Sequence, residues 1–117
     1  MKEGWRSMKQ DNKWGEFCEI LGVNPRNRIL EFLIETRELD FTIGDISREI
    51  GMNRATTYNV VEQLINEEYI IPTRRVSGTQ LYKLNTEKKE VKILIETFNL
   101  VLSKIVKGHR DKLRVRI

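Results

Sequence analysis

Cysteine and histidine are almost absent from the sequence, since each occurs only once, as Cys18 and His109. A single cysteine excludes an internal disulfide, and the default location of such a chain is the reducing cytoplasm. A structural zinc site needs about four cysteine or histidine ligands, so no metal site is predicted. The sequence leaves open whether Cys18 has a redox role.

Long apolar runs and glycine-rich loops are also missing. No run of about 18 apolar residues occurs, so we predict no membrane span and no membrane partner. The N-terminal stretch is charged and does not resemble a secretory signal. Gly44, Gly51 and Gly78 are isolated, which excludes a phosphate-binding loop. Asp40 and Asp45 flank a short extended segment and suit turn and cap positions, so we predict neither an enzyme nor a cofactor.

The charge balance is moderately basic. Lys and Arg number 21 against 17 for Asp and Glu, which gives a net charge of +4 and a pI near 9.3. This balance permits nucleic-acid binding but does not establish it. The 117 residues, 39% of them apolar, suit one domain with an added helix.

The stretch from Asp45 to Leu64 has the pattern of two short helices joined by a tight turn. Gly51 can take the left-handed conformation that ends a helix, and Asn53 suits an N-cap. The second helix buries Thr57, Val61 and Leu64, which recur at intervals of four and three residues. This pattern predicts a helix-turn-helix, although an ordinary helical hairpin has similar packing.

The exposed start of the second helix carries side chains that can hydrogen-bond to base edges and phosphates. We expect Arg54, Thr56 and Asn59 to read base edges, with Tyr58 and Gln63 at the margins. The full set predicted to bind DNA from this helix is Asn53, Arg54, Thr56, Thr57, Tyr58, Asn59 and Gln63.

Pro72 prevents the preceding helix from resuming, and a β-hairpin is predicted there, with strands over 71–76 and 80–84 joined by a loop of small residues. Its basic tip could lie along a phosphate backbone, although a solvated turn has the same composition. The residues predicted to bind DNA from the hairpin are Arg74, Arg75, Ser77, Gly78, Thr79 and Lys83.

Two helices are predicted before the helix-turn-helix. Trp14, Phe17, Cys18 and Leu21 form a short apolar stripe that ends at Gly22. Asn24–Pro25 then starts a core helix, because asparagine is a good N-cap and proline is favoured at the first helical position.

The two segments IGDISREIGMNRATTYNVVEQLINEEYI and RRVSGTQLYKL resemble the ArsR/MarR-type winged-helix regulators of archaea and bacteria. The resemblance covers about half of the chain. It implies a winged helix-turn-helix whose hairpin is the wing. The family usually has Gly-Leu-Ile where this chain has Glu68-Tyr69-Ile70. Its metal-sensing members carry paired cysteines, which are absent here, so metal sensing is not implied.

The segment 86–108 is predicted to form a C-terminal helix that Gly108 ends, followed by a basic tail over 109–117. Its apolar residues recur at intervals of three and four, as in a contact between two helices. We expect this helix to pair with its copy in a second chain, because closed two-fold dimers are the commonest oligomers. A helix folded back on its own domain is the alternative. The predicted dimer interface is Trp14, Phe17, Leu21, Val91, Leu94, Ile95, Phe98, Val101, Leu102 and Ile105.

The sequence thus predicts a mainly α fold with a small β-hairpin: a flexible basic arm over 1–12, a winged helix-turn-helix domain over 13–85 and the dimerisation helix. The predicted function is that of a homodimeric regulator that binds double-stranded DNA. A protein-interaction module is the alternative, because one fold serves both functions and Glu62, Glu67 and Glu68 make part of the surface acidic. The sequence identifies no small-molecule effector.

Overall fold

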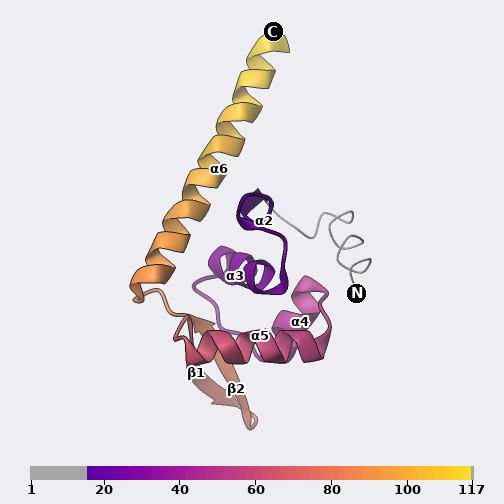
Figure 1. Cartoon of the computed structure of the whole chain (residues 1–117), viewed down its shortest axis with the longest axis vertical. Coiled ribbons are helices and arrows are strands. Elements are labelled where there is room, and N and C mark those ends of the chain that lie inside the picture. Colours follow the sequence, from indigo (N-terminus) through magenta and orange to yellow (C-terminus); the bar gives the residue numbers. More distant parts are fainter. Residues whose placement is uncertain (1–15, 117) are drawn as a thin grey trace.

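The computed structural model describes the chain from residue 16 to residue 116, with side chains from 18 to 103. A helical domain with a β-hairpin at one end carries a long C-terminal helix that projects beyond it (Figure 1). The predicted basic arm and Trp14 lie outside the described residues, as do the side chains of Phe17 and Ile105.

Helices α2 (Glu16–Leu21) and α3 (Pro25–Glu35) are joined by a short link. Gly22, at φ 119°, follows α2 in a conformation that favours glycine. Asn24 caps α3, because its side chain accepts a hydrogen bond from the Asn27 amide at 2.8 Å. The two helices predicted here are confirmed.

The helix-turn-helix consists of α4 (Ile43–Ile50) and α5 (Arg54–Asn66). Thr42 and Asp45 form a capping box at the start of α4, in which each side chain bonds to the other residue's amide. Gly51 ends α4 in the left-handed conformation, at φ 65°. Asn53 then caps α5. Gly51 and Asn53 thus occupy the cap positions predicted for them, and the predicted turn is confirmed.

Strands β1 (Ile70–Val76) and β2 (Thr79–Leu84) form the antiparallel hairpin. The two-residue turn at Ser77 and Gly78 has positive φ at both positions, as a type I′ hairpin requires. Phe41 bridges Tyr82 on the other edge of β2 through two hydrogen bonds of 2.8 Å. This hairpin is the wing of the fold.

Helix α6 (Lys89–Arg116) is longer than predicted. Gly108 does not end it, and the segment predicted as a basic tail is helical to Arg116. A glycine inside a helix costs only about 1 kcal/mol, and good helix formers such as Lys107 and Arg110 flank it. The prediction of a helix end at Gly108 was therefore wrong.

The core lies where α3, α4, α5 and the hairpin meet. Val91 and Phe98 of α6 belong to this core, at 0% and 9% exposure. Both were predicted to lie in a dimer interface. Their burial shows that the first turns of α6 pack on their own domain, as the alternative held. The other core members include Ile29, Leu33, Ile34, Ile46, Ile50, Val61, Leu64, Ile70 and Leu84.

Candidate nucleic-acid interface

The first three turns of α5 present polar side chains to solvent. Arg54, Asn59 and Gln63 are exposed, and Thr56 is half-buried. Asn53 is exposed but engaged, because its side-chain oxygen accepts a hydrogen bond from the Thr56 amide at 3.2 Å. This cap fixes the start of the helix and therefore the directions in which the following side chains project.

Thr57 does not belong to this exposed surface. It is fully buried, and its hydroxyl donates to the Asn53 carbonyl oxygen at 2.9 Å. The prediction that Thr57 binds DNA is corrected on this ground. Its position among Val61 and Leu64 on the apolar face of α5 already indicated burial.

Arg54 turns toward α4. Its guanidinium lies over the ring of the half-exposed Tyr58, 5.8 Å from the centroid. A β-carbon built on Gly44 would lie 3.5 Å from Nη2 of Arg54 and 3.7 Å from Nη1 of Arg48. Two arginines from different helices therefore flank one backbone position of α4. Sequence reasoning missed Arg48, although its place opposite Ile46 and Ile50 indicated an exposed side chain.

The wing carries its basic residues in two distinct settings. Arg75 donates to the Gly78 carbonyl oxygen at 2.7 Å, which holds its guanidinium over the turn. Arg74 instead binds the carboxylate of Asp40 through Nε at 2.9 Å and Nη2 at 3.2 Å. Ser77, Gly78 and Thr79 are exposed at the tip, and Lys83 is half-buried.

A β-bulge explains how two consecutive side chains of β1 reach Asp40. The pairing shifts register between Pro72 and Arg75, so Thr73 and Arg74 together lie opposite Leu81. Thr73 donates its hydroxyl to Asp40 at 2.7 Å, beside the two bonds from Arg74. These bonds lower the pKa of Asp40 to about 2. Sequence reasoning had given Asp40 only a turn role, because no local pattern links it to a strand more than thirty residues later.

A recess of about 240 Å³ lies between the start of α4, the start of α5 and the first residues of β2 in the wing. Its polar lining consists mainly of hydrogen-bond donors, with two guanidinium groups, one amide and several hydroxyls. The described residues that line it include no carboxylate. They are Thr42, Ile43, Gly44, Arg48, Arg54, Tyr58, Thr79, Gln80 and Tyr82.

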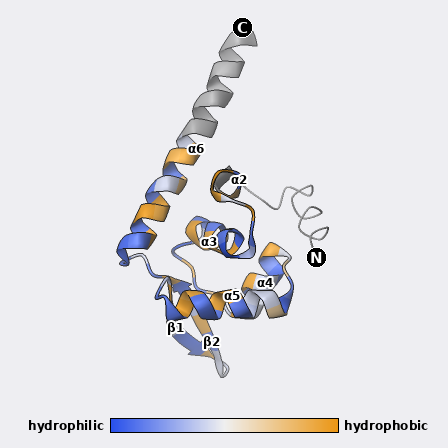
Figure 2. Cartoon of the chain, in the orientation of Figure 1, coloured by the Kyte–Doolittle hydropathy of each residue, from blue (hydrophilic) through white to orange (hydrophobic). Residues whose placement is uncertain are grey.

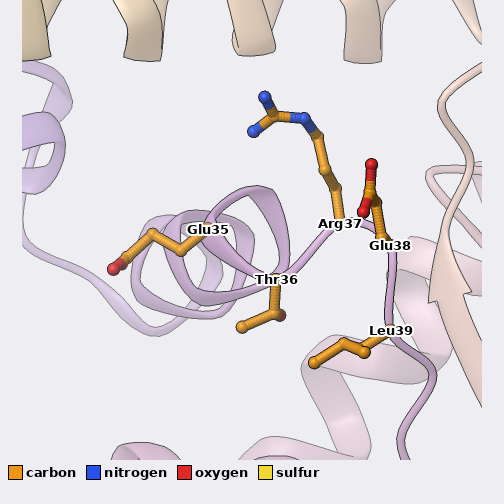
Figure 3. Close-up of a pocket in the computed structure, with 5 residues that line it drawn as sticks. All are labelled: Glu35, Thr36, Arg37, Glu38 and Leu39. Carbon is orange, nitrogen blue, oxygen red and sulfur yellow. The ribbon is translucent and has the colours of Figure 1, made fainter.

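A second recess, of about 430 Å³, lies at the C-terminal end of α3. Figure 3 shows that Arg37 and Glu38 extend to one side of the chain, whereas Thr36 and Leu39 extend to the other. Burial, with the nearby charge of Glu31, raises the pKa of Glu35. These side chains therefore do not converge on one point of the recess.

Cys18 lies inside the domain rather than at its surface. It is fully buried, and burial, followed by the charge of Glu31, raises the pKa of its thiol to about 12. The reactive thiolate is therefore disfavoured at neutral pH. Among the described residues no group of three His, Cys, Asp or Glu side chains could hold a metal ion.

The residues predicted for the dimer interface fall into three groups. Val91 and Phe98 are buried in the domain, as described above. Leu94, Ile95 and Val101 are half-buried, and Leu21 and Leu102 are 43% and 44% exposed. Ile20, Ile93 and Leu100 are further exposed apolar residues on the same two helices, and Val23 is an exposed apolar residue in the link after α2. Figure 2 shows where hydrophobic residues, in orange, lie along α2 and along the described part of α6.

Residues 28–71 match the model of the IclR helix-turn-helix domain. The helix-turn-helix predicted from the sequence is thereby confirmed, whereas the ArsR/MarR-type assignment is not. No curated protein matches the chain in sequence. In the described part of the chain, no helix is both long enough and apolar enough to cross a membrane.

Solved structures of bacterial regulators resemble the chain at low sequence identity. MepR, a transcription regulator of the Staphylococcus aureus multidrug efflux pump MepA, is 16% identical with a TM-score of 0.60, over 92% of this chain and 76% of that chain. ZitR of Lactococcus lactis is 14% identical with a TM-score of 0.56, over 74% and 64%. A MepR mutant bound to an oligodeoxyribonucleotide is 17% identical with a TM-score of 0.54, over 96% and 77%. The chain therefore has the winged helix-turn-helix fold that these structures share.

Proposed function

We propose that the protein is a sequence-specific, double-stranded DNA-binding transcription regulator that acts as a homodimer. One observation carries the proposal: the capped, exposed start of α5 lies beside a hairpin whose tip is basic. A helix presented in this way fits the major groove, and a basic wing fits the backbone beside it. The likeness to a regulator bound to an oligodeoxyribonucleotide supports this proposal.

Asn59 is the residue best suited to read a base. It is exposed nearly two turns beyond the cap, and an asparagine amide can donate to and accept from adenine at the same time. Thr56 is half-buried beside it and can donate one hydrogen bond to a base edge, and Gln63 lies one turn further along α5. The wing residues Arg75 and Lys83 would neutralise phosphates, which carry no sequence information.

The apolar surface that remains exposed supports the homodimer. Leu102 lies beyond the part of α6 that packs on the domain, and Ile20 and Leu21 of α2 are also exposed. Pairing of this surface with a second copy would remove its apolar residues from water. A two-fold dimer would place two α5 helices roughly 34 Å apart, which requires a palindromic site.

Selection of bound duplexes from random DNA tests the proposal directly. We expect a single enriched site with two inverted half-sites about one helical turn apart. Recovery of unenriched sequences would contradict sequence-specific recognition. The exposed acids Glu62, Glu67 and Glu68 at the end of α5 would then favour a protein-interaction module, although Glu67 already binds Arg26 at 2.7 Å.

The reading role of α5 is tested by Asn59→Ala, with Asn66→Ala as its matched control. Both asparagines are exposed on α5, but Asn66 lies at its C-terminal end. Asn59→Ala should lose roughly 1–3 kcal/mol of discrimination at one base pair of each half-site, and Asn66→Ala should lose none. Binding to single-base variants of the selected duplex gives the answer, with circular dichroism as the folding control.

A further inference from the structure

Arg48 and Arg54 give the recess between α4, α5 and the wing a cationic lining. The two guanidinium groups flank the same backbone position, at Gly44. Arg48 has a carboxylate partner, since its Nη2 donates to Asp45. Among the described residues Arg54 has no carboxylate partner, and its guanidinium lies over the Tyr58 ring. Two neighbouring guanidinium charges repel each other unless an anion or solvent screens them.

The rest of the lining suits a phosphate diester. Thr42 and Thr79 contribute hydroxyls and Gln80 contributes an amide, whereas the described lining contains no carboxylate. Gln80 is already engaged, because its amide nitrogen donates to the carbonyl oxygens of Arg74 and Leu81 at 3.0 Å. Among the described residues of the lining, Arg54 is therefore the guanidinium without a carboxylate partner, and Arg48 lies beside it with one bond to Asp45. An arginine fork matches phosphate oxygens in geometry as well as in charge.

The position of the recess identifies which phosphate would enter it. Neighbouring major and minor grooves of B-DNA are separated by one sugar–phosphate strand. If α5 occupies a major groove and the wing lies toward the next minor groove, that strand must pass between α5 and the wing. The recess lies between these two elements.

We infer that Arg48 and Arg54 together bind a backbone phosphate of the DNA strand that passes between α5 and the wing. Arg54 is then a positioning residue that fixes the register of α5, and not a reader of base edges as the sequence suggested. The inference depends on the proposed DNA-binding function. It adds a phosphate contact from α4, a helix to which no DNA contact had been assigned.

Salt dependence provides the first test, on a short duplex of mixed sequence and on the duplex selected from random DNA. Arg54→Ala should lower the slope of log K against log salt by up to about 0.9 per protomer, because the two arginines neutralise one phosphate. Arg48→Ala should lower it by less, because Asp45 already offsets part of its charge. Both effects should be the same on the two duplexes. Arg54→Lys keeps the charge and should keep most of the slope. Lys92→Ala, which removes an exposed charge from α6, is the matched control and should leave the slope unchanged.

Neutral methylphosphonates, placed one at a time along the selected duplex, provide the second test. The wild type should lose affinity at several positions. Arg54→Ala should become insensitive at one of these positions while it keeps the wild-type response to every base-pair change. Loss of discrimination at a single base pair, with every phosphate response unchanged, would overturn the inference and make Arg54 a base reader.

The two tests separate the inference from the proposed function. If the wild type binds no duplex in a salt-dependent way, the proposed function fails and the inference fails with it. If the wild type selects a palindromic site but both arginine variants keep its salt slope, only the inference fails. Circular dichroism of each variant establishes that the fold persists. If an alanine variant does not fold, the salt slope and the base-pair responses of Arg54→Lys are compared with those of the wild type instead.

Discussion

Asp40 binds Arg74 through two hydrogen bonds, from Nε at 2.9 Å and from Nη2 at 3.2 Å. The pair joins the residue before the Phe41 bridge to the bulged part of β1. It therefore ties the wing to the chain that leads into α4, beyond what the hairpin pairing alone provides. The same pair also partly neutralises one of the two arginines of the wing.

The pH dependence of stability should report on this link. The folded-state pKa of Asp40 is about 2, below the ordinary value of about 3.9. The stabilisation that ionised Asp40 gives the folded protein is therefore fully present at pH values above the ordinary pKa. It is lost as pH falls through the folded-state pKa. We expect Asp40→Asn to flatten the fall in urea midpoint between about pH 4 and pH 2. Asp45, whose pKa is also lowered, should leave the variant some residual slope. Identical pH profiles for the two proteins would contradict the link.

Arg74 and Arg75 should contribute unequally to DNA binding. Both are exposed, but only Arg74 has a carboxylate partner among the described residues. Arg75→Ala should lower the salt slope by about 0.9 per protomer, and Arg74→Ala by less, because Asp40 already offsets its charge. Both changes should weaken binding to all sequences alike. Equal slope losses would show that DNA displaces Asp40 from Arg74.

Leu102 tests the dimer better than Phe98 does. Phe98 is buried in the domain, so changing it would disturb the fold itself. Leu102→Asp would bury a charge only in the dimer, at a cost of several kcal/mol. Sedimentation should then report a folded monomer, whereas Ser103→Asp, an exposed neighbour on another face of α6, should stay dimeric. A wild-type protein that is monomeric at micromolar concentration would exclude the dimer.

Glu68 occupies a strained backbone position between α5 and the wing. Its φ is 63°, in the left-handed region, where a side chain costs about 1 kcal/mol. Glu68→Gly should therefore raise the free energy of unfolding by up to about 1 kcal/mol. The greater conformational entropy that glycine gives the unfolded chain reduces this gain. Glu68→Ala keeps the strain and should change little. Chemical denaturation measures both, and a destabilised glycine variant would contradict the prediction.

Local patterns predicted the helices and the wing because local chemistry determines them. Asn24, Gly51 and Asn53 act at the helix ends where they were placed, each through its own backbone or side-chain geometry. The left-handed backbone at Glu68 was not predicted, although the family that the chain resembles usually has glycine at this position. By contrast, Gly108 misled the prediction, because a favourable helical context outweighs the small cost of one glycine.

Contacts between residues far apart in the chain could not be predicted from local sequence patterns. Nothing near Asp40 indicates that a bulge brings Thr73 and Arg74 to it. The apolar repeat of α6 likewise cannot distinguish residues that pack on their own domain from those left exposed. The packing of the domain against α6 determines which of these residues are buried: Val91 is buried, whereas Leu102 stays exposed.

Pro72 has a consequence for how copies of the chain meet in solution. The backbone groups of Tyr82 that face away from β1 bond to Phe41, so the nitrogen of Pro72, its partner in β1, faces the outer edge of the hairpin. That edge thus lacks a donor, the neighbouring bulge bends it, and Arg74 and Arg75 add positive charge. Proline, bulges and charge each discourage the addition of a foreign strand. The wing can therefore remain exposed, as its proposed contact with DNA requires, without seeding β-aggregation.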